Sequence, residues 1–372
     1  ARGYAPATLP LPEAFRGAPA VAAYGGQLKS AICLARDGAA LLSHHLGDLD
    51  DAATAAAFAE ADRDYAAVFD HAPAILACDA HPDFLATRHA EARAAALGAP
   101  LERVQHHHAH VAAAMAEAGW SPTDGPVLGV ALDGLGWGPD GTIWGGEWLL
   151  CGYAEAKRLA RLAPVPLLGG AAAQREPWRC LLAHLDAAGL AEAADRLLPE
   201  KPRATLRAAA ARGLNAPLTS AAGRLFDAAA AALGLAPYRI SFEGEAAMGL
   251  ESAALAAPDA PPLPFARRGD ALDPAPMWRA LLAEPDPARA AAGFHRGLAL
   301  AAASLARDLA KAHGARAVAL SGGCFQNALL LEETLAALGG AGPVLISSEA
   351  PMNDGGLALG QAAVAMARAG RL

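Results

Sequence analysis

The sequence predicts an α/β protein of two lobes, and two patterns that recur along the chain support this prediction. A glycine-containing hairpin followed by helical sequence occurs near residue 37 and again about a hundred residues later. A buried strand, a glycine loop and a helix then follow one another twice in the last third of the chain. At 372 residues, the chain is long enough for two domains or one large bilobal unit.

The two hairpins are predicted from apolar runs that flank turn sequences. Residues 28–34 and 39–45 flank Arg36-Asp37-Gly38. In the second hairpin, residues 127–132 are typical of a buried strand, Asp133-Gly134-Leu135-Gly136 is the expected turn, and a return strand is expected over residues 142–150. Two such units suggest a duplicated lobe.

The last third predicts a long helix and two strand–loop–helix units. Phe294, Leu298, Leu305 and Leu309 form an apolar stripe at helical spacing that ends at Gly314, a suitable C-terminal cap. Strands are expected over residues 318–320 and 344–347, and helices over residues 327–338 and 357–367. The glycine loops between them would gather backbone N–H groups at one edge of a sheet. Residues 257–287 carry many prolines and are expected to be an exposed connection.

Composition and charge argue against several classes of protein. The net charge is −8 and there is no long basic run, which argues against a nucleic-acid partner. The five cysteines are dispersed and form no C-x-x-C pair, a pattern typical of a reduced compartment and not of a disulfide scaffold or zinc finger. No apolar stretch reaches the roughly 18 residues that span a bilayer. We therefore expect a soluble, cytoplasmic protein with no nucleic-acid partner and no membrane partner.

Four histidines lie within five positions at residues 106–110. His106 and His110 are four residues apart, so on a helix their imidazoles share a face and converge on one ion. A zinc protease would need Glu directly after the first histidine, and that position is His107, so peptide hydrolysis is disfavoured. The alternative is a solvated, histidine-rich helix start without a ligand.

Two acidic residues are candidates to complete such a site. Asp354 would supply a hard oxygen ligand, and two histidines with one carboxylate favour non-haem Fe(II), with zinc also possible. The alternative for Asp354 is to cap the helix that follows it. Asp133, at a strand end among glycines, is either a turn former or a second carboxylate that faces the same cleft.

Other segments suggest an anion or nucleotide site. Ser321-Gly322-Gly323 suits phosphate because glycine lets the backbone approach an anion, although a plain turn is equally compatible, and no P-loop sequence follows. Asp227 and Glu243 would accept hydrogen bonds from ribose hydroxyls, or would be ordinary surface acids. Lys29 lies in an apolar run where its charge needs a partner, and an anion in the cleft would serve.

Taken together, the segments resemble the C-terminal part of the HypF carbamoyltransferases of nickel–iron hydrogenase maturation. The segments that carry the resemblance occur in this order: Leu28-Lys29-Ser30, Asp79-Ala80-His81-Pro82-Asp83, residues 104–110, Ala131-Leu132-Asp133-Gly134, Gly145-Gly146-Glu147, Arg175-Glu176-Pro177-Trp178-Arg179, residues 223–227, Phe242-Glu243-Gly244, residues 320–327, and Asn353-Asp354-Gly355-Gly356. One departure is Leu135, where the family more often has a small hydroxyl residue.

The resemblance implies an actin-like ATPase (ASKHA) fold, with two RNase H-like lobes and nucleotide in the cleft between them. Residues 1–20, which lack periodicity, would be the linker that follows a YrdC-like domain, and Arg2-Gly3-Tyr4-Ala5-Pro6 resembles that junction. The chain would then be part of a longer protein. Residues 21–123 would form the N-terminal lobe with the histidine motif, and residues 124–372 the nucleotide-binding lobe.

The resemblance also implies roles for individual residues. His106, His110 and Asp354 would hold the metal, most favourably Fe(II), while Asp133 and Lys29 would act in catalysis. The remaining candidates would bind ATP, an AMP-type nucleotide or carbamoyl adenylate: Gly134, Gly223, Asp227, Glu243, Gly322, Gly323, Asn327 and Gly355.

The implied reaction is carbamoyl transfer from carbamoyl adenylate to the C-terminal cysteine of a HypE-type acceptor protein, with the YrdC-like domain as a second partner. Two related activities are alternatives: tRNA threonylcarbamoyl transfer, which the acidic balance disfavours, and O-carbamoylation of a small molecule. A non-catalytic nucleotide-binding scaffold is an alternative of another class, and the intact metal-ligand pattern argues against it.

Overall fold

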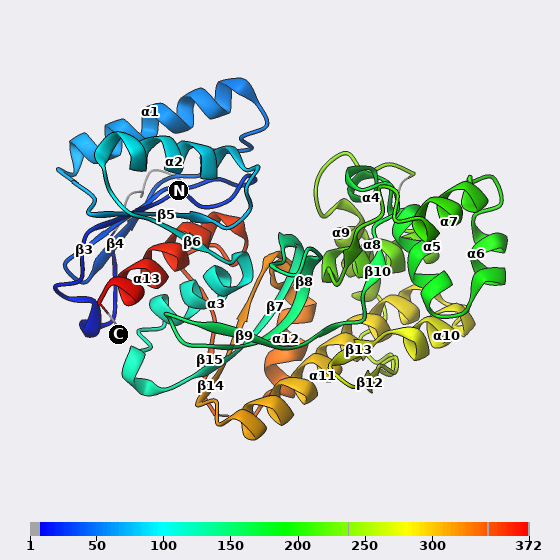
Figure 1. The fold of residues 1–372 in the computed structure, drawn as a ribbon. Coiled ribbons are helices and arrows are strands. Elements are labelled where there is room, and N and C mark those ends of the chain that lie inside the picture. Colours follow the sequence, from blue (N-terminus) through cyan, green and yellow to red (C-terminus); the bar gives the residue numbers. More distant parts are fainter. Residues whose placement is uncertain (1–7, 237, 341, 371–372) are drawn as a thin grey trace.

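The computed structural model describes residues 8–236, 238–340 and 342–370, and the chain forms two α/β lobes side by side (Figure 1). The N-terminal lobe contains the blue and cyan elements, and the C-terminal lobe most of the green to orange ones. The expected junction sequence Arg2-Gly3-Tyr4-Ala5-Pro6 lies outside the described residues. Among the described residues, no helix has both the length and the apolar character needed to cross a bilayer.

The N-terminal lobe is built on a six-stranded sheet with the order β1-β4-β3-β2-β5-β6. Its strands are β1 (Thr8–Pro10), β2 (Val21–Ala23), β3 (Cys33–Arg36), β4 (Ala39–Leu42), β5 (Ile75–Asp79) and β6 (Leu101–Val104). β2, β3 and β4 are antiparallel, whereas β5 runs parallel to β2 and β6 parallel to β5. The predicted first hairpin is confirmed: Asp37 and Gly38 join β3 to β4 with φ values of 51° and 75°, as a tight hairpin turn requires.

The C-terminal sheet repeats the strand arrangement of the N-terminal sheet, with β7 (Val127–Trp137) in the place of β2. β7, β8 (Ile143–Cys151) and β9 (Ala156–Leu162) are antiparallel, and β14 (Ala317–Ser321) runs parallel to β7 with β15 (Val344–Leu345) beside it. The sheet also contains β10 (Val165–Pro166), β11 (Leu218–Thr219), β12 (Ala266–Arg268) and β13 (Ala271–Asp273). Both sheets therefore place three antiparallel strands beside two parallel ones, and the lobes share one topology.

Helices cover both faces of the N-terminal sheet. α1 (Ala52–Val68) and α2 (Leu85–Leu97) pack on one face, where Tyr24, Phe58 and Leu76 are buried. α13 (Leu357–Gly370) packs on the other face, while α3 (His106–Glu117) packs on the C-terminal sheet. The two helices also pack on each other, so together they form a layer between the two lobes (Figure 1). The last helix in the sequence thus lies against the first sheet.

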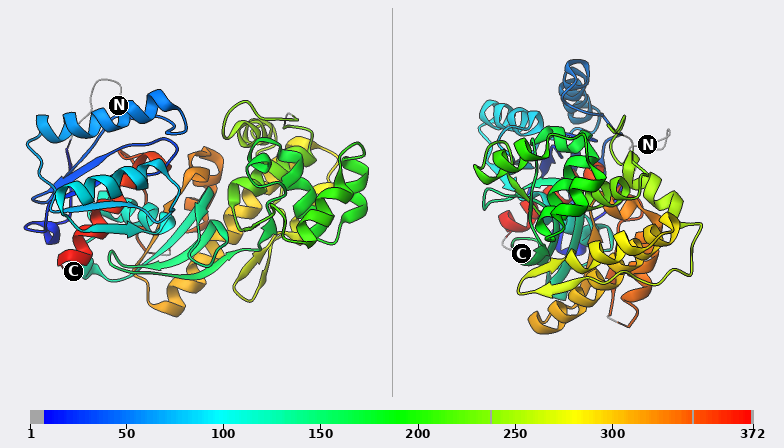
Figure 2. Two further views of the ribbon diagram at one scale, coloured as in Figure 1. Left: turned by 45° about the horizontal axis from the view of Figure 1, so that its top comes forward. Right: turned by 90° about the vertical axis from the view of Figure 1, so that its right-hand side faces the viewer.

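Most of the other helices belong to the C-terminal lobe. They are α4 (Ala171–Arg175), α5 (Pro177–Ala187), α6 (Ala191–Leu197), α7 (Arg203–Ala211), α8 (Ala222–Ala232), α9 (Glu245–Ala254), α10 (Ala275–Ala283), α11 (Pro287–His313) and α12 (Ala328–Ala337); short 3-10 turns are η1 (Glu13–Phe15), η2 (Pro122–Asp124), η3 (Gly323–Gln326) and η4 (Asp354–Gly356). The left view of Figure 2 shows the green helices at the end of the molecule opposite the N-terminal lobe.

Three expectations from the sequence are corrected. Residues 8–20 are not a linker, because β1 pairs with β4 and Phe15 is fully buried. Residues 257–287 are not an exposed connection, because they contain β12, β13 and α10, and Trp278 is fully buried. The segment 124–372 is not one lobe, because its last helix, α13, packs on the N-terminal sheet.

Candidate active site

The histidine motif forms the first turn of α3, immediately after β6. Gln105 caps the helix, since its side-chain oxygen accepts a hydrogen bond from the His108 N–H at 2.9 Å. His106 and His110 lie one turn apart, and each is only 1% exposed. The solvated helix start considered from the sequence is therefore wrong.

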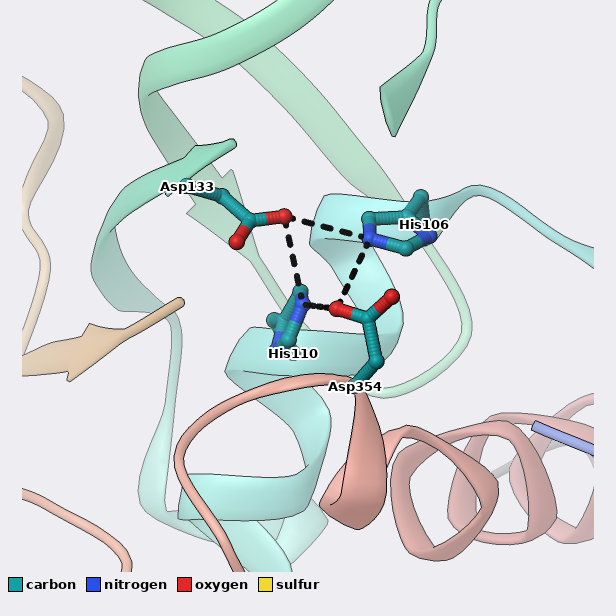
Figure 3. Close-up of side chains that lie close together, drawn as sticks. All are labelled: His106, His110, Asp133 and Asp354. Atoms are coloured by element: carbon teal, nitrogen blue, oxygen red, sulfur yellow. Dashed lines mark hydrogen bonds and ion pairs between the residues drawn. The ribbon is translucent and has the colours of Figure 1, made fainter. Parts of the chain in front are cut away.

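Asp354 lies in η4, directly before α13, and does not cap that turn. The cap is Asn353, whose side-chain oxygen accepts a hydrogen bond from the Gly355 N–H at 2.9 Å. The Asp354 carboxylate is thereby left to point toward the histidines (Figure 3).

Four side chains converge at the layer between the lobes (Figure 3). One ligand atom from each of His106, His110, Asp133 and Asp354 lies within 4.8 Å of all the others. The Nε2 atom of His106 is 3.3 Å from Oδ2 of Asp133 and 3.7 Å from Oδ1 of Asp354. The Nε2 atom of His110 is 3.6 Å and 3.5 Å from the same two oxygens.

The cluster is electrostatically suited to a cation. Burial by itself would lower the pKa of His106, but the charge of Asp79 and contacts with the two carboxylates raise that pKa well above its usual value. Burial by itself would raise the pKa of Asp133 and Asp354, but the two imidazoles hold both below their usual range. Both carboxylates are therefore ionised near neutral pH, as metal ligands must be.

The residues present fit a divalent transition metal. Two imidazole nitrogens and two carboxylate oxygens form a donor set that suits Fe(II) or zinc. The Nε2 atom of His110 is buried and has no hydrogen-bond partner among the described residues, so a shared ion would satisfy it. Of the two roles considered for Asp133, the structure favours the second carboxylate, because its oxygen lies as close to the two histidines as that of Asp354.

Asp79 orients His106 from the other side of the ring. Its Oδ2 atom is 2.7 Å from Nδ1 of His106, and the Asp79 side chain is fully buried at the end of β5. A carboxylate on the remote nitrogen fixes the tautomer that presents Nε2 to an ion. No role was assigned to Asp79 from the sequence. The signal that could have found it is its place at the end of β5: the histidine motif follows the end of the parallel strand β6, so the two segments meet at one edge of the sheet.

Asp133 connects the histidine cluster to the glycine loop after β14. The expected turn at residues 133–136 is instead an irregularity within β7, where its pairing with β8 shifts register between Leu132 and Gly136. There the Oδ1 atom of Asp133 accepts a hydrogen bond from the Gly323 N–H at 2.9 Å, while Oδ2 faces the histidines.

The glycine loop is less open to an anion than the sequence suggested. Both of its glycine N–H groups already have acceptors within the protein. The Gly323 N–H donates to the Asp133 carboxylate, and the Gly322 N–H donates to the Met352 carbonyl at 3.0 Å. Gly322 has a φ of +104°, and an added Cβ would lie 2.3 Å from the Leu132 carbonyl oxygen, so this position requires glycine for packing.

A cavity of about 370 Å³ holds most of the predicted nucleotide residues. It is lined by Lys29, Asp133, Gly134, Gly223, Asp227, Glu243, Gly323 and Asn327, together with residues not predicted from the sequence, such as Arg224 and Asn353. Gly223 and Gly134 are in close contact there, because a Cβ on Gly223 would lie 3.0 Å from the Gly134 Cα. Gly322 and Gly355 do not line this cavity.

A second cavity of about 690 Å³ adjoins the first and includes Asp354. Both volumes are in the range of small-molecule sites, which is about 300–1,000 Å³. Four residues line both cavities: Asp133, Gly134, Arg224 and Glu243. The two cavities therefore meet beside the histidine cluster.

Three of the predicted residues around the cavities have protein partners that change their expected roles. Lys29 forms an ion pair with Glu243 from the opposite lobe, so its charge does not depend on a bound anion. Asp227 is buried and pairs with Arg224 at 3.0 Å. Asn327 caps α12 by accepting a hydrogen bond from the Leu330 N–H at 2.8 Å.

Comparison with protein-family models gives two matches that together cover most of the chain. Residues 16–117 match the HypF Kae1-like domain, and residues 129–361 match the second subdomain of the carbamoyltransferase Kae1-like domain. The first match begins within the segment expected to be a linker, in agreement with the structure.

Among curated proteins, carbamoyltransferase HypF from Rhodobacter capsulatus is 56% identical over 99% of this chain and 49% of that protein. A carbamoyltransferase HypF homolog from Cupriavidus necator is 41% identical over 95% of this chain and 93% of that protein. This chain thus spans about half the length of the first of these relatives and nearly all of the second.

Two solved structures of HypF proteins superpose closely on this chain. Full-length HypF in its phosphate- and nucleotide-bound form superposes with a TM-score of 0.90 and 32% identity, over 98% of this chain and 57% of that one. HypF from T. kodakarensis superposes with a TM-score of 0.88 and 30% identity, over 98% of this chain and 49% of that one. The predicted two-lobed α/β fold is confirmed, as the fold of HypF.

Proposed function

Because the chain belongs to the HypF carbamoyltransferase family, as its Kae1-like domain, we propose that it transfers a carbamoyl group from carbamoyl adenylate to a cysteine thiolate. The acceptor is the C-terminal cysteine of a HypE-type protein. The observation that carries the proposal is Asp133, whose two oxygens join the buried histidine cluster to the glycine loop where two cavities meet.

The proposed reaction is a simple acyl transfer. The thiolate attacks the carbamoyl carbon, a sulfur–carbon bond forms, and the bond from that carbon to the phosphate oxygen breaks. AMP leaves with the electron pair, and the thiol proton is lost to solvent or to a nearby base. The products are an S-carbamoyl cysteine and AMP, so no oxidant or reductant is needed.

His106, His110, Asp133 and Asp354 are the residues that would hold a divalent metal, with Fe(II) favoured and zinc possible. A bound ion would supply Lewis-acid polarisation of the carbamoyl carbonyl. The protein's own contribution is to keep the carboxylates ionised and His106 oriented by Asp79.

The smaller cavity is the proposed nucleotide site. Asp227 and Glu243 line it and would accept hydrogen bonds from ribose hydroxyls. A side chain at Gly223 would press on the backbone, because its Cβ would lie 3.0 Å from the Gly134 Cα, so glycine at this position keeps the cavity open to the ligand. Lys29, paired with Glu243, contributes positive charge at the same cavity and is better suited to charge stabilisation than to proton abstraction, because its pKa is raised.

The transfer is tested by supplying carbamoyl adenylate and an acceptor protein with a C-terminal cysteine. Mass spectrometry of the acceptor should show one added carbamoyl group with the wild-type chain and none with Asp354→Ala, and chelation of the metal should abolish the transfer. His106→Ala combined with His110→Ala should remove the metal, as measured by elemental analysis. An unmodified acceptor with the metal-loaded wild-type chain would reject the transfer role.

Formation of the adenylate itself is proposed to belong to a YrdC-like domain acting as a partner. The chain alone, given carbamoyl phosphate and ATP, should therefore release no pyrophosphate above a buffer control. Addition of that domain in trans should restore both pyrophosphate release and acceptor modification. Robust pyrophosphate release by the chain alone would contradict this division of labour.

A further inference from the structure

The larger cavity has its own residues and does not merely extend the nucleotide site. Gly223, Asp227, Gly323 and Asn327 line only the smaller cavity, whereas Asp354 lines only the larger one. A nucleotide in the smaller cavity would therefore leave the larger cavity free, with its inner end at the metal cluster. Group transfer needs a second substrate, and this cavity gives it an approach to the reacting carbon.

The walls of the larger cavity carry opposite charges. Asp48 and Asp50 come from the N-terminal lobe, between β4 and α1, and Arg175 and Arg239 come from the C-terminal lobe. Arg175 ends α4, and its carbonyl accepts a hydrogen bond from the Ile240 N–H at 2.9 Å, which ties the segment of Arg239 to it. Both arginines are exposed, so their guanidinium groups are open to a ligand in the cavity.

A third arginine lies at the junction of the two cavities. Arg224 lines both, its side chain is only 9% exposed, and its Nε atom is buried without a hydrogen-bond partner among the described residues. A buried guanidinium with an unused donor is costly unless a ligand completes it. Guanidinium groups bind carboxylates through paired hydrogen bonds, which gives both affinity and direction.

We propose that the larger cavity receives the C-terminal residue of the acceptor, with Arg175 and Arg239 binding its terminal carboxylate. This rests on the proposed transfer to a C-terminal cysteine. A terminal cysteine carries its thiol and its α-carboxylate on one residue. Binding of the carboxylate to Arg175 and Arg239 therefore limits where the thiol can lie. Capture of a terminal carboxylate is a recurring mode of peptide recognition. The two arginines thus select a terminal cysteine over an internal one.

The test compares two labelled peptides of one sequence that end in cysteine, one with a free carboxylate and one with a C-terminal amide. Fluorescence anisotropy measures the binding of each to the metal-loaded chain, and mass spectrometry measures carbamoyl transfer in parallel. The wild-type chain should bind the acid about tenfold more tightly than the amide. In a variant carrying both Arg175→Gln and Arg239→Gln, the acid should bind as weakly as the amide, while the affinity for AMP stays at the wild-type value.

The matched control is Arg212→Gln, which changes an exposed arginine of the same lobe at the end of α7, away from both cavities. It should keep the preference for the acid. Equal binding of acid and amide by the wild-type chain would overturn the inference even if transfer proceeds. Weaker AMP binding in the double arginine variant would also overturn it, because the larger cavity would then hold nucleotide. A preference for the acid without any transfer would leave the subsite standing and reject the proposed function.

Discussion

Asp79 contacts Nδ1 of His106 and so orients the Nε2 atom toward the cluster. A single substitution separates this role from metal ligation. Asp79→Asn keeps the size of the side chain but removes the charge that raises the pKa of His106 and fixes its tautomer. We expect metal affinity to fall by about 10- to 100-fold, the usual loss when a hydrogen-bond partner of a ligand is removed. Competition with a chromophoric chelator measures it.

Asp83→Asn is the matched control for this prediction. Asp83 lies on the loop that directly follows β5, but its side chain is exposed and contacts Arg88, not the cluster. The control should bind metal like the wild type, and both variants should keep the wild-type melting temperature within a few degrees, since neither change creates a cavity. Equal metal affinity in Asp79→Asn and Asp83→Asn would show that His106 is held correctly without Asp79.

At the scale of elements, the site depends on how closely α3 approaches α13. α3 carries His106 and His110, Asp354 precedes α13, and the two helices meet at Gly360. A Cβ on Gly360 would lie 1.8 Å from the Ala109 carbonyl oxygen, a backbone atom that cannot turn away. Gly360→Ala should therefore separate the helices, with a loss of about 1–3 kcal/mol or more of unfolding free energy and weaker metal binding. Chemical denaturation and elemental analysis measure the two effects.

Gly152→Ala is the control for that substitution, because a Cβ at Gly152 would meet no atom within 4 Å and its φ is not positive. It should cost less than about 0.5 kcal/mol. A Gly360→Ala variant with wild-type stability would mean that the interface between α3 and α13 shifts without cost.

Local patterns predicted the elements well, whereas long-range contacts decided the site. The hairpin of β3 and β4, and Gly314 at the end of α11, follow from turn chemistry and periodicity that lie within a few residues. The His106 and His110 spacing indicated one face of a helix for the same reason. Asp79 and Arg224 were missed because their roles depend on strand ends and cavities that no local pattern shows. Residues 8–20 were misjudged because β1 is a short edge strand, and its pairing with β4 is visible only in the sheet.

At the scale of the whole molecule, the two lobes are joined on two sides of the cleft. The layer of α3 and α13 joins them at the base, and Gln361 of α13 exchanges hydrogen bonds of 2.8 Å and 3.0 Å with the backbone of Gly25. The loop that begins there carries Lys29, whose ammonium group pairs with Glu243 of the C-terminal lobe. This ion pair lies at the cavity proposed for the nucleotide.

The Lys29–Glu243 pair leads to a prediction about nucleotide affinity. If the pair acts as one unit that holds the lobes together over the nucleotide, Lys29→Met and Glu243→Gln should weaken AMP binding equally, and the double variant should be no weaker than either. Because Glu243 is about half exposed and the pair is screened by solvent, the loss should not exceed about fivefold. Calorimetry on the four proteins gives the coupling through a double-mutant cycle. Losses that simply add would mean that Glu243 binds the ribose independently of Lys29, and a loss confined to Glu243→Gln would leave Lys29 without a part in nucleotide binding.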